Sequence, residues 1–193
     1  MTAQATSEST TVQTPAGAVT IQGRIFAKWR ALERVKSPDG DDVQAHLGPP
    51  LGEQSVVPAK HGAGAQQLFR RGMIVESDEG GSYVVYGAIY DRYLEMGGTA
   101  SALGRPTSDE EDAGGGRVAH FRYGDIYWRA DFGHRVVLGR DRGLYAGRPS
   151  GGGGVWFTRH RRRDPFRRTW ADRGAALYES IRRAMARLPS PPR

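Results

Sequence analysis

The most constraining feature of this chain is an internal duplication. Three motifs occur twice in the same order, and the matched segments are LGPPLGE (47–53) with LGRPTSD (103–109), FRRGMI (69–74) with FRYGDI (121–126), and VVYG (84–87) with VVLG (136–139). Such a recurrence indicates a duplicated structural unit. Repeated units pack on their neighbours and commonly form extended binding surfaces. A catalytic site, in contrast, normally needs residues that occur once, so the duplication favours a binding function.

The spacing between matched residues sets the limits of the two copies. Phe69 and Phe121 are 52 positions apart, whereas Leu47 and Leu103 are 56 positions apart. The first copy is therefore longer between its Leu-Gly turn and its Phe motif. An earlier match at residues 21–25 places the copies at residues 23–86 and 87–139. The additional residues of the first copy are rich in Gly, Pro, Asp and Ser, a composition typical of surface loops.

Each copy is predicted to contain a short helix, a turn and a β-hairpin. In the second copy Ile89, Tyr93 and Met96 have helical spacing, and the glycines after them are a helix terminator. The pattern predicts a helix at residues 88–96, a turn at 103–106, strands at 117–128 and 134–138, and a turn at 131–133 between them. An isolated hairpin is marginal in water, so we expect the copies to share a hydrophobic core.

Composition divides the 193 residues into four segments: a disordered N-terminal arm (1–18), the repeat domain (19–147), a Gly- and Arg-rich linker (148–163) and a C-terminal amphipathic helix (164–188). Residues 159–193 contain eleven Arg and three acidic residues, a net charge of +8, whereas the rest of the chain has a net charge of −1. Any nucleic-acid binding would therefore use the C-terminal segment.

The C-terminal segment has an apolar stripe at helical spacing with arginines opposite it. We assign an interaction surface to Arg161, Arg162, Arg163, Arg167, Arg168 and Trp170. Three partners fit this surface: the repeat domain or another protein, an anionic membrane, and the phosphates of nucleic acid. Docking on protein is the favoured interpretation, because the apolar stripe needs cover.

The second copy resembles the LGFP repeat. The residues between Gly87 and Gly139 follow the pattern Gly-x-Ile-x-x-x-Tyr, Gly-Gly, Leu-Gly-x-Pro-x-x-(Asp/Glu)-(Glu/Gln), Phe-x-x-Gly-x-Ile-Tyr-Trp and Val-x-Gly, and a looser copy precedes them. Pro49 and Arg105 stand where the family has Phe. The resemblance implies an α+β fold of tandem, propeller-blade-like repeats. It also implies an actinobacterial protein that is held to the cell-wall polysaccharide.

A group of aromatic and acidic residues in the second copy is the candidate ligand site. Tyr123, Tyr127 and Trp128 are placed on one predicted strand, with Asp109 and Glu110 nearby. A flat ring can stack on the C–H face of a sugar, and carboxylates can accept hydrogen bonds from its hydroxyls. The alternative is structural: one ring packs while the other covers the hairpin edge, and Asp109 caps local backbone N–H groups in a solvated turn.

The sequence contains no pattern typical of a catalytic or metal site. Cysteine is absent, the five histidines are not at ligand spacing, and neither a Gly-x-Ser-x-Gly motif nor a phosphate-binding loop occurs. We therefore expect a protein that is not an enzyme and that needs neither a cofactor nor a metal.

Non-catalytic binding of a cell-envelope polysaccharide or surface component is the favoured function. The alternatives are a cytoplasmic assembly protein that binds a protein partner or forms a homo-oligomer, and a nucleic-acid-binding protein that uses its C-terminal arginines. The polar start of the chain lacks the pattern of a signal peptide, and no apolar run is long enough to cross a membrane. This predicts a cytoplasmic location, with cell-wall association after non-classical export as the alternative.

Overall fold

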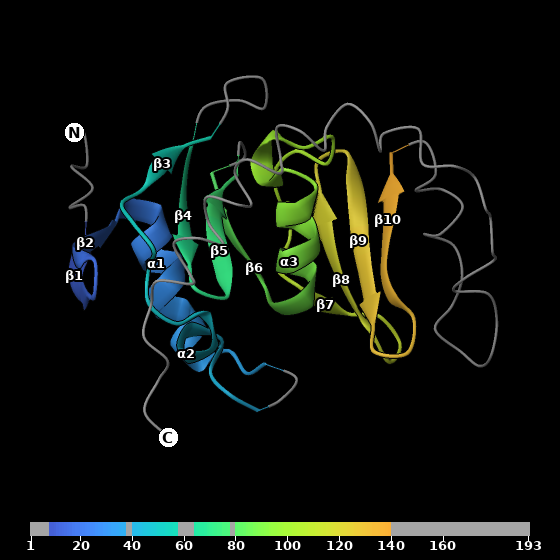
Figure 1. Ribbon diagram of the computed structural model, residues 1–193, viewed down its shortest axis with the longest axis horizontal. Helices are drawn as coiled ribbons and strands as arrows, with labels where there is room; N and C mark the ends of the chain where they lie inside the picture. Colours follow the sequence, from blue (N-terminus) through green and yellow to red (C-terminus); the bar gives the residue numbers. More distant parts are fainter. Residues whose placement is uncertain (1–7, 38–39, 58–63, 78–79, 140–193) are drawn as a thin grey trace, which may run out of the picture.

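The computed structural model describes residues 8–139, except for 38–39, 58–63 and 78–79. Two four-stranded antiparallel sheets dominate it, each with its strands paired in chain order (Figure 1). The first sheet consists of β3 (Ser55–Val56), β4 (Ala65–Phe69), β5 (Gly72–Glu76) and β6 (Ser82–Tyr86). The second sheet consists of β7 (Glu111–Asp112), β8 (Arg117–Phe121), β9 (Gly124–Arg129) and β10 (Gly133–Leu138). A separate hairpin precedes them, formed by β1 (Ser9–Thr14) and β2 (Gly17–Gln22).

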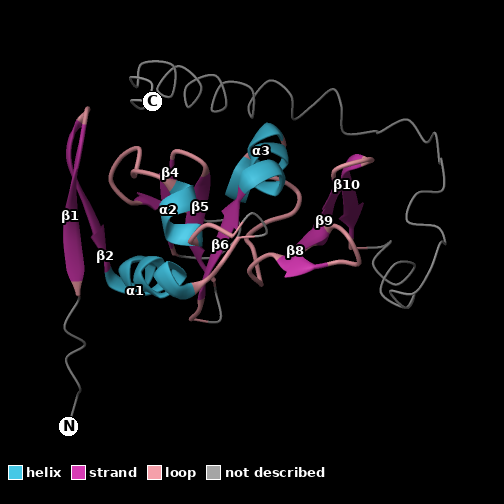
Figure 2. Ribbon diagram, turned by 90° about the horizontal axis from the view of Figure 1, so that it is seen from below, coloured by secondary structure: helices cyan, strands magenta, loops and turns pink. Residues whose placement is uncertain are grey.

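Helices connect the sheets and cover them. In the described part of the chain, α1 (Gly23–Ala31) follows β2, α2 (Val43–Leu47) precedes the first sheet, and α3 (Gly87–Glu95) follows β6. Among the described residues, the 3-10 helices η1 (Leu32–Arg34) and η3 (Gly98–Ala100) follow α1 and α3. Both views place the hairpin, the first sheet, α3 and the second sheet in a row that ends at β10 (Figures 1 and 2). None of the described helices is long and apolar enough to cross a membrane.

The two sheets have the same strand register, which confirms the duplication predicted from the sequence. Ile74 lies opposite Val84 in the first sheet, and Ile126, which is 52 positions later, lies opposite Val136 in the second. The outer strands β3 and β7 contain only two residues each. Each copy therefore combines a helix with a sheet, in agreement with the expected α+β repeats, but the sheet has four strands where a hairpin was expected.

Close packing links the Leu-Gly turn to the Phe motif in each copy. A Cβ atom on Gly72 would lie 2.3 Å from Leu47 Cδ2, and one on Gly124 would lie 2.7 Å from Leu103 Cδ2. Both leucines are fully buried. The glycine of each Phe-x-x-Gly motif thus makes room for the leucine of the preceding turn, which explains why the two motifs occur together.

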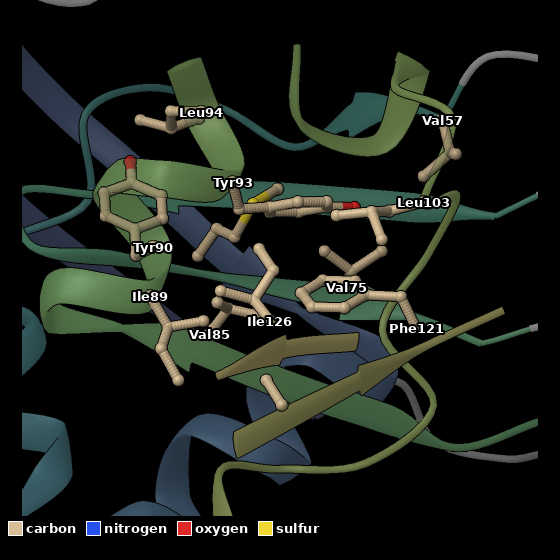
Figure 3. Packing of buried hydrophobic residues seen from close by; sticks show 12 residues of the cluster. Val57, Val75, Val85, Ile89, Tyr90, Tyr93, Leu94, Leu103, Phe121 and Ile126 are labelled. Atoms are coloured by element: carbon tan, nitrogen blue, oxygen red, sulfur yellow. The ribbon is translucent and has the colours of Figure 1, made fainter. Parts of the chain in front are cut away.

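The hydrophobic core is shared between the copies, as the sequence predicts. One cluster joins the first sheet, α3 and the second sheet (Figure 3), and its members are Val57, Met73, Val75, Val85, Ile89, Tyr90, Tyr93, Leu94, Leu103, Ala119, Phe121 and Ile126. The ring centroids of Tyr93 and Phe121 are 4.5 Å apart, and the Tyr93 hydroxyl donates a hydrogen bond to Gly104 O at 2.5 Å. A second cluster joins β2, α1 and the first sheet.

A buried arginine also crosses between the copies. Arg105 follows the Leu-Gly pair of the second turn and is only 2% exposed. Its Nη1 donates a hydrogen bond to Glu76 O of β5 at 3.0 Å. Burial lowers the pKa of the Arg105 guanidinium, and the charge of Glu76 opposes that change. The turn of the second copy is therefore anchored in the first by polar as well as apolar contacts.

Two expectations about local structure are wrong. The predicted disordered arm includes β1 and the start of β2, because alternating Thr and Val residues flank a Pro-Ala-Gly turn and form a hairpin. The predicted strand at 117–128 is two strands, because Arg122 and Tyr123 form a tight turn ahead of Gly124. The linker at 148–163 and the helix at 164–188 lie outside the described residues.

Candidate functional site

Two acidic side chains of the second copy cover the free edge of the first sheet. Asp109 Oδ1 accepts a hydrogen bond from the Val84 N–H at 3.0 Å, and Glu110 Oε1 accepts one from the Tyr86 N–H at 3.2 Å. Both N–H groups belong to β6, which is an edge strand. Asp109 also forms an ion pair with Lys28 of α1. We call a pair of adjacent side chains that bonds to the preceding edge strand in this way an edge cap.

The first copy carries an equivalent edge cap on β2. Glu53 Oε1 accepts a hydrogen bond from the Thr20 N–H at 2.9 Å, and Gln54 Nε2 donates one to Gln22 O at 2.8 Å. Both capping residues lie 56 positions before their counterparts in the second copy. The acidic turn was expected to cap its own backbone. Asp109 and Glu110 instead bond to the preceding strand, because a sheet edge has unpaired N–H and C=O groups, whereas Asp112 does accept a hydrogen bond from the nearby Gly114 N–H.

A pocket of about 190 Å³ lies beside the edge cap on β6. Its walls come from both copies, and we refer to it as the junction pocket; it is lined by Ser37, His46, Tyr86, Gly87, Ala88, Ile89, Glu110, Arg117 and Trp128. Pockets for drug-sized ligands typically have volumes of about 300–1,000 Å³. The junction pocket therefore has room for one ring or one short group of a larger ligand.

Some polar atoms of the junction pocket have no hydrogen-bond partner among the described residues. Ser37 is 6% exposed, and its buried Oγ is one of these atoms. The Nε of Arg117 is another, although it lies 3.8 Å from Glu110 Oε2. Arg117 Nη2 donates a hydrogen bond to the Glu110 backbone oxygen at 2.9 Å. A buried polar atom without a hydrogen-bond partner is unfavourable in a folded protein.

Burial raises the pKa values of two residues at the edge cap on β6, Glu110 and Tyr86. The Glu110 side chain is 5% exposed, and its removal from water raises the pKa of its carboxyl to about 7. The hydrogen bond from the Tyr86 N–H and the charge of Arg117 oppose this rise. Burial and the charge of Glu110 also raise the pKa of the Tyr86 hydroxyl. Near neutral pH, Glu110 can therefore either accept or donate a hydrogen bond.

Aromatic rings provide the apolar part of the pocket wall. Trp128 is partly buried and lies opposite Arg117 in the β8–β9 pair. The rings of His46 and Tyr86 meet edge to face, with centroids 5.6 Å apart and planes at 69°. A flat ring beside hydrogen-bonding groups can receive a ligand that is apolar on one face and polar at its rim.

The fold divides the five residues that were predicted to form one site. Glu110 and Trp128 line the junction pocket, whereas Asp109 caps β6. Tyr127 precedes Trp128 on β9, so its side chain lies on the opposite face of the sheet. Tyr123 is not on a strand with them but in the turn between β8 and β9, where it is 43% exposed.

Four further polar or aromatic residues of the pocket were not identified from the sequence. Tyr86 lies within the repeated VVYG motif, and Arg117 begins a predicted strand. The sequence pattern therefore suggested a structural role for both residues and not a place in a binding site. Ser37 and His46 come from the longer part of the first copy and carry no motif. Only the packing of the first copy against the second brings these two residues to Glu110.

The remaining candidates do not form a site in the described residues. No group of three or more metal-ligating side chains occurs among them. His120 Nδ1 lies 2.7 Å from Asp125 Oδ1, while His134 is on β10, so β9 separates the two histidines. The basic surface predicted at Arg161, Arg162, Arg163, Arg167, Arg168 and Trp170 lies outside the described part of the chain.

Comparison with known protein families gives a match. The family model for the LGFP repeat matches residues 47–101 and 103–153, which together make up more than half of the chain. No curated protein matches the sequence. Each matched segment begins at the leucine of a Leu-Gly turn, so one repeat consists of that turn, a four-stranded sheet and the segment after the sheet. The edge cap on β6 and the junction pocket therefore lie where two successive repeats meet.

Proposed function

This chain belongs to the LGFP repeat family, and we propose that it is a non-catalytic module that binds a cell-envelope polysaccharide. The junction pocket receives one sugar unit of the polymer. The observation that carries this proposal is a single pocket lined by the Trp128 ring, the Arg117 guanidinium and Ser37, whose hydroxyl has no hydrogen-bond partner among the described residues. The proposal depends on that combination and not on the family match alone, since fold does not fix function.

A sugar matches the pocket in both shape and hydrogen bonding. Its C–H face can stack on the ring of Trp128, and its hydroxyls both donate and accept hydrogen bonds. Ser37 Oγ can donate or accept, Arg117 Nε can donate, and Glu110 can do either near neutral pH. Because one small pocket gives weak binding, a polymer that is engaged at several points would bind much more tightly than a single sugar.

The surroundings of the carboxylates favour binding over hydrolysis. Glycoside hydrolases generally use two carboxyl groups about 5–10 Å apart on either side of the scissile bond. Asp109, the carboxylate next to Glu110, is engaged by Lys28 and by the Val84 N–H. Among the residues that line the junction pocket, Glu110 is the single carboxyl group.

The Ser37→Ala variant tests the proposed site without disturbing a hydrogen bond of the described structure. Its affinity for purified cell-wall polysaccharide, measured by calorimetry, should be about 2- to 10-fold lower than that of the unchanged protein, because one hydrogen bond is lost. Ser9→Ala is the matched control, since Ser9 is an exposed residue of β1 outside the pocket. Equal affinity of Ser37→Ala and the unchanged protein would show that the sugar does not bind in this pocket.

Cellular location separates this proposal from the cytoplasmic assembly function. A module that binds envelope polysaccharide must reach the envelope, so fractionation of native cells should recover the protein in the wall fraction. Recovery in the cytosol alone would contradict the proposal, whatever the affinity of the purified protein.

A further inference from the structure

The last strand of the second sheet, β10, has an outer edge like those of β2 and β6, and each of those two edges is covered by an edge cap. Among the described residues, β10 ends the row of sheets and is an edge strand like β6 (Figure 1). Val136 and Leu138 hold the register in β10 that Val84 and Tyr86 hold in β6. Their N–H groups therefore point away from β9, as the capped N–H groups point away from β5. Within the described residues, no edge cap bonds to this strand.

The basic residue that pairs with the edge cap on β6 also has a counterpart in the next helix. Lys28 of α1 pairs with the capping residue Asp109. Arg92 of α3 lies 64 positions after Lys28, which is the offset between Gly23 and Gly87 at the starts of the two helices. Arg92 Nη1 lies 3.0 Å from Glu95 Oε2 in a solvent-exposed pair on the same helix. Such pairs are weak, so Arg92 can exchange Glu95 for another carboxylate.

Burial differs between the capped and the uncapped edge. Val84 and Tyr86 are buried, whereas Val136 and Leu138 are only partly buried. The Val84 and Tyr86 side chains pack in the cluster of β2, α1 and the first sheet, and the second copy adds the edge cap on their N–H groups. Within the described residues, β10 has no such cap, and the side chains of Val136 and Leu138 are less covered than their counterparts.

Neither of the two spacings seen in the described copies places an acidic pair in position to cap β10. The cap on β2 begins 31 residues after that strand ends, and the cap on β6 begins 23 residues after β6 ends. The same spacings after β10 lead to residues 161–162 and 169–170, and none of these is Asp or Glu. Both Leu-Gly turns of the chain already serve β2 and β6, so a second copy has no free turn to offer.

We propose that the outer edge of β10 is a docking site for an edge cap supplied by a different polypeptide. The partner presents a turn of the pattern Leu-Gly-x-Pro-x-x-(Asp/Glu)-(Glu/Gln), as a further repeat of this kind would. Its first acidic residue accepts a hydrogen bond from the Val136 N–H and pairs with Arg92. Its second capping residue bonds to the backbone of Leu138.

Nuclear magnetic resonance of the full chain tests this docking site. The probe is a peptide with the sequence of residues 103–112, titrated into the isotopically labelled protein while the amide signals of Val136 and Leu138 are followed. Both signals should shift and saturate. A control peptide with alanine in place of Asp109 and Glu110 should leave both signals unchanged, because it lacks the capping groups.

Two charge variants of the protein complete the test. Arg92→Glu should weaken peptide binding by about tenfold or more, because it replaces attraction by repulsion. Arg34→Glu makes the same charge change at an exposed residue of η1 and should bind like the unchanged protein. If Arg92→Glu does not fold, as judged by circular dichroism, Arg92→Gln takes its place with the same direction of effect.

Three results would overturn the proposal. The first is the absence of shifts at millimolar peptide, and the second is an equal response to the alanine peptide. The third is a concentration-dependent shift of the Val136 and Leu138 signals in the protein alone, which would place a second copy of this chain at the edge.

Discussion

Glu110 accepts a hydrogen bond from the Tyr86 N–H at 3.2 Å, across the junction of two LGFP repeats. One repeat earlier, Gln54 at the equivalent position donates a hydrogen bond to Gln22 O. An uncovered strand edge can pair with other chains, so the edge caps both join neighbouring repeats and protect their sheets. This relationship gives a physical reason for the acidic or amide residues that follow each Leu-Gly turn.

Loss of the first capping residue should destabilise the protein. Asp109→Ala removes the acceptor of the Val84 N–H and the partner of Lys28, whose side chain is 18% exposed. A polar group left unsatisfied in a partly buried site costs about 1–3 kcal/mol, and we expect the free energy of unfolding in urea to fall by that amount. Glu111→Ala, at an exposed neighbouring position, should change it by less than about 0.5 kcal/mol. Similar unfolding midpoints for the two variants would show that the cap does not stabilise the junction.

The raised pKa of Glu110 predicts a loss of stability with rising pH. Its carboxyl has a pKa of about 7 in the folded protein and an ordinary value of 4.5, so the folded state binds more protons between these values. The free energy of unfolding should therefore decrease between about pH 5 and pH 8, by about 3 kcal/mol from this residue. Below the pKa of the unfolded state, the Glu110 carboxyl is protonated in both the folded and the unfolded protein. There, this residue no longer makes the free energy of unfolding depend on pH.

Glu110→Gln is the control for that pH dependence. The amide does not ionise but keeps an oxygen that can accept the Tyr86 N–H. Urea unfolding of this variant should depend less on pH than that of the unchanged protein, and the variant should be the more stable of the two at pH 8. Parallel pH profiles for the two proteins would contradict the raised pKa.

The paired glycines should tolerate no side chain. Gly72→Ala would bring a Cβ atom within 2.3 Å of Leu47 Cδ2, and Gly124→Ala would bring one within 2.7 Å of Leu103 Cδ2. Overpacking of this kind typically costs about 1–3 kcal/mol, so both variants should unfold at lower urea concentrations. Gly52→Ala is the matched control, because its Cβ atom would meet nothing within 4 Å. A stable Gly72→Ala variant would mean that the turn can move away from the strand.

The fold was predictable where short motifs determine it. The Leu-Gly turn and the Phe-x-x-Gly motif contact each other within one copy, so their recurrence correctly indicated a repeated unit. The same local signals failed at the N-terminus, where the polar Thr-rich strands β1 and β2 resemble a disordered arm in composition. They also failed at Tyr123, because a two-residue turn without a preceding glycine or proline interrupts an otherwise continuous strand pattern.

The site was predictable only in part, because its contacts cross between the copies. Glu110 and Trp128 were chosen for their chemistry and do line one pocket. The residues that complete it, Ser37 and His46, lie far away along the chain and carry no recurring pattern. Arg105 shows the same limit: a charged residue in a turn is normally exposed, yet here it is buried between the repeats.

Retention of the protein on insoluble cell-wall polysaccharide tests the central claim most directly, when Trp128→Leu is compared with Tyr123→Ala. Trp128→Leu keeps an apolar side chain against the core but removes the flat ring of the junction pocket. Tyr123→Ala removes an exposed ring outside it. With both variants folded by circular dichroism, Trp128→Leu should be retained about tenfold less strongly than the unchanged protein, and Tyr123→Ala should be retained equally. Full retention of folded Trp128→Leu would contradict a sugar-binding pocket at the junction of the repeats.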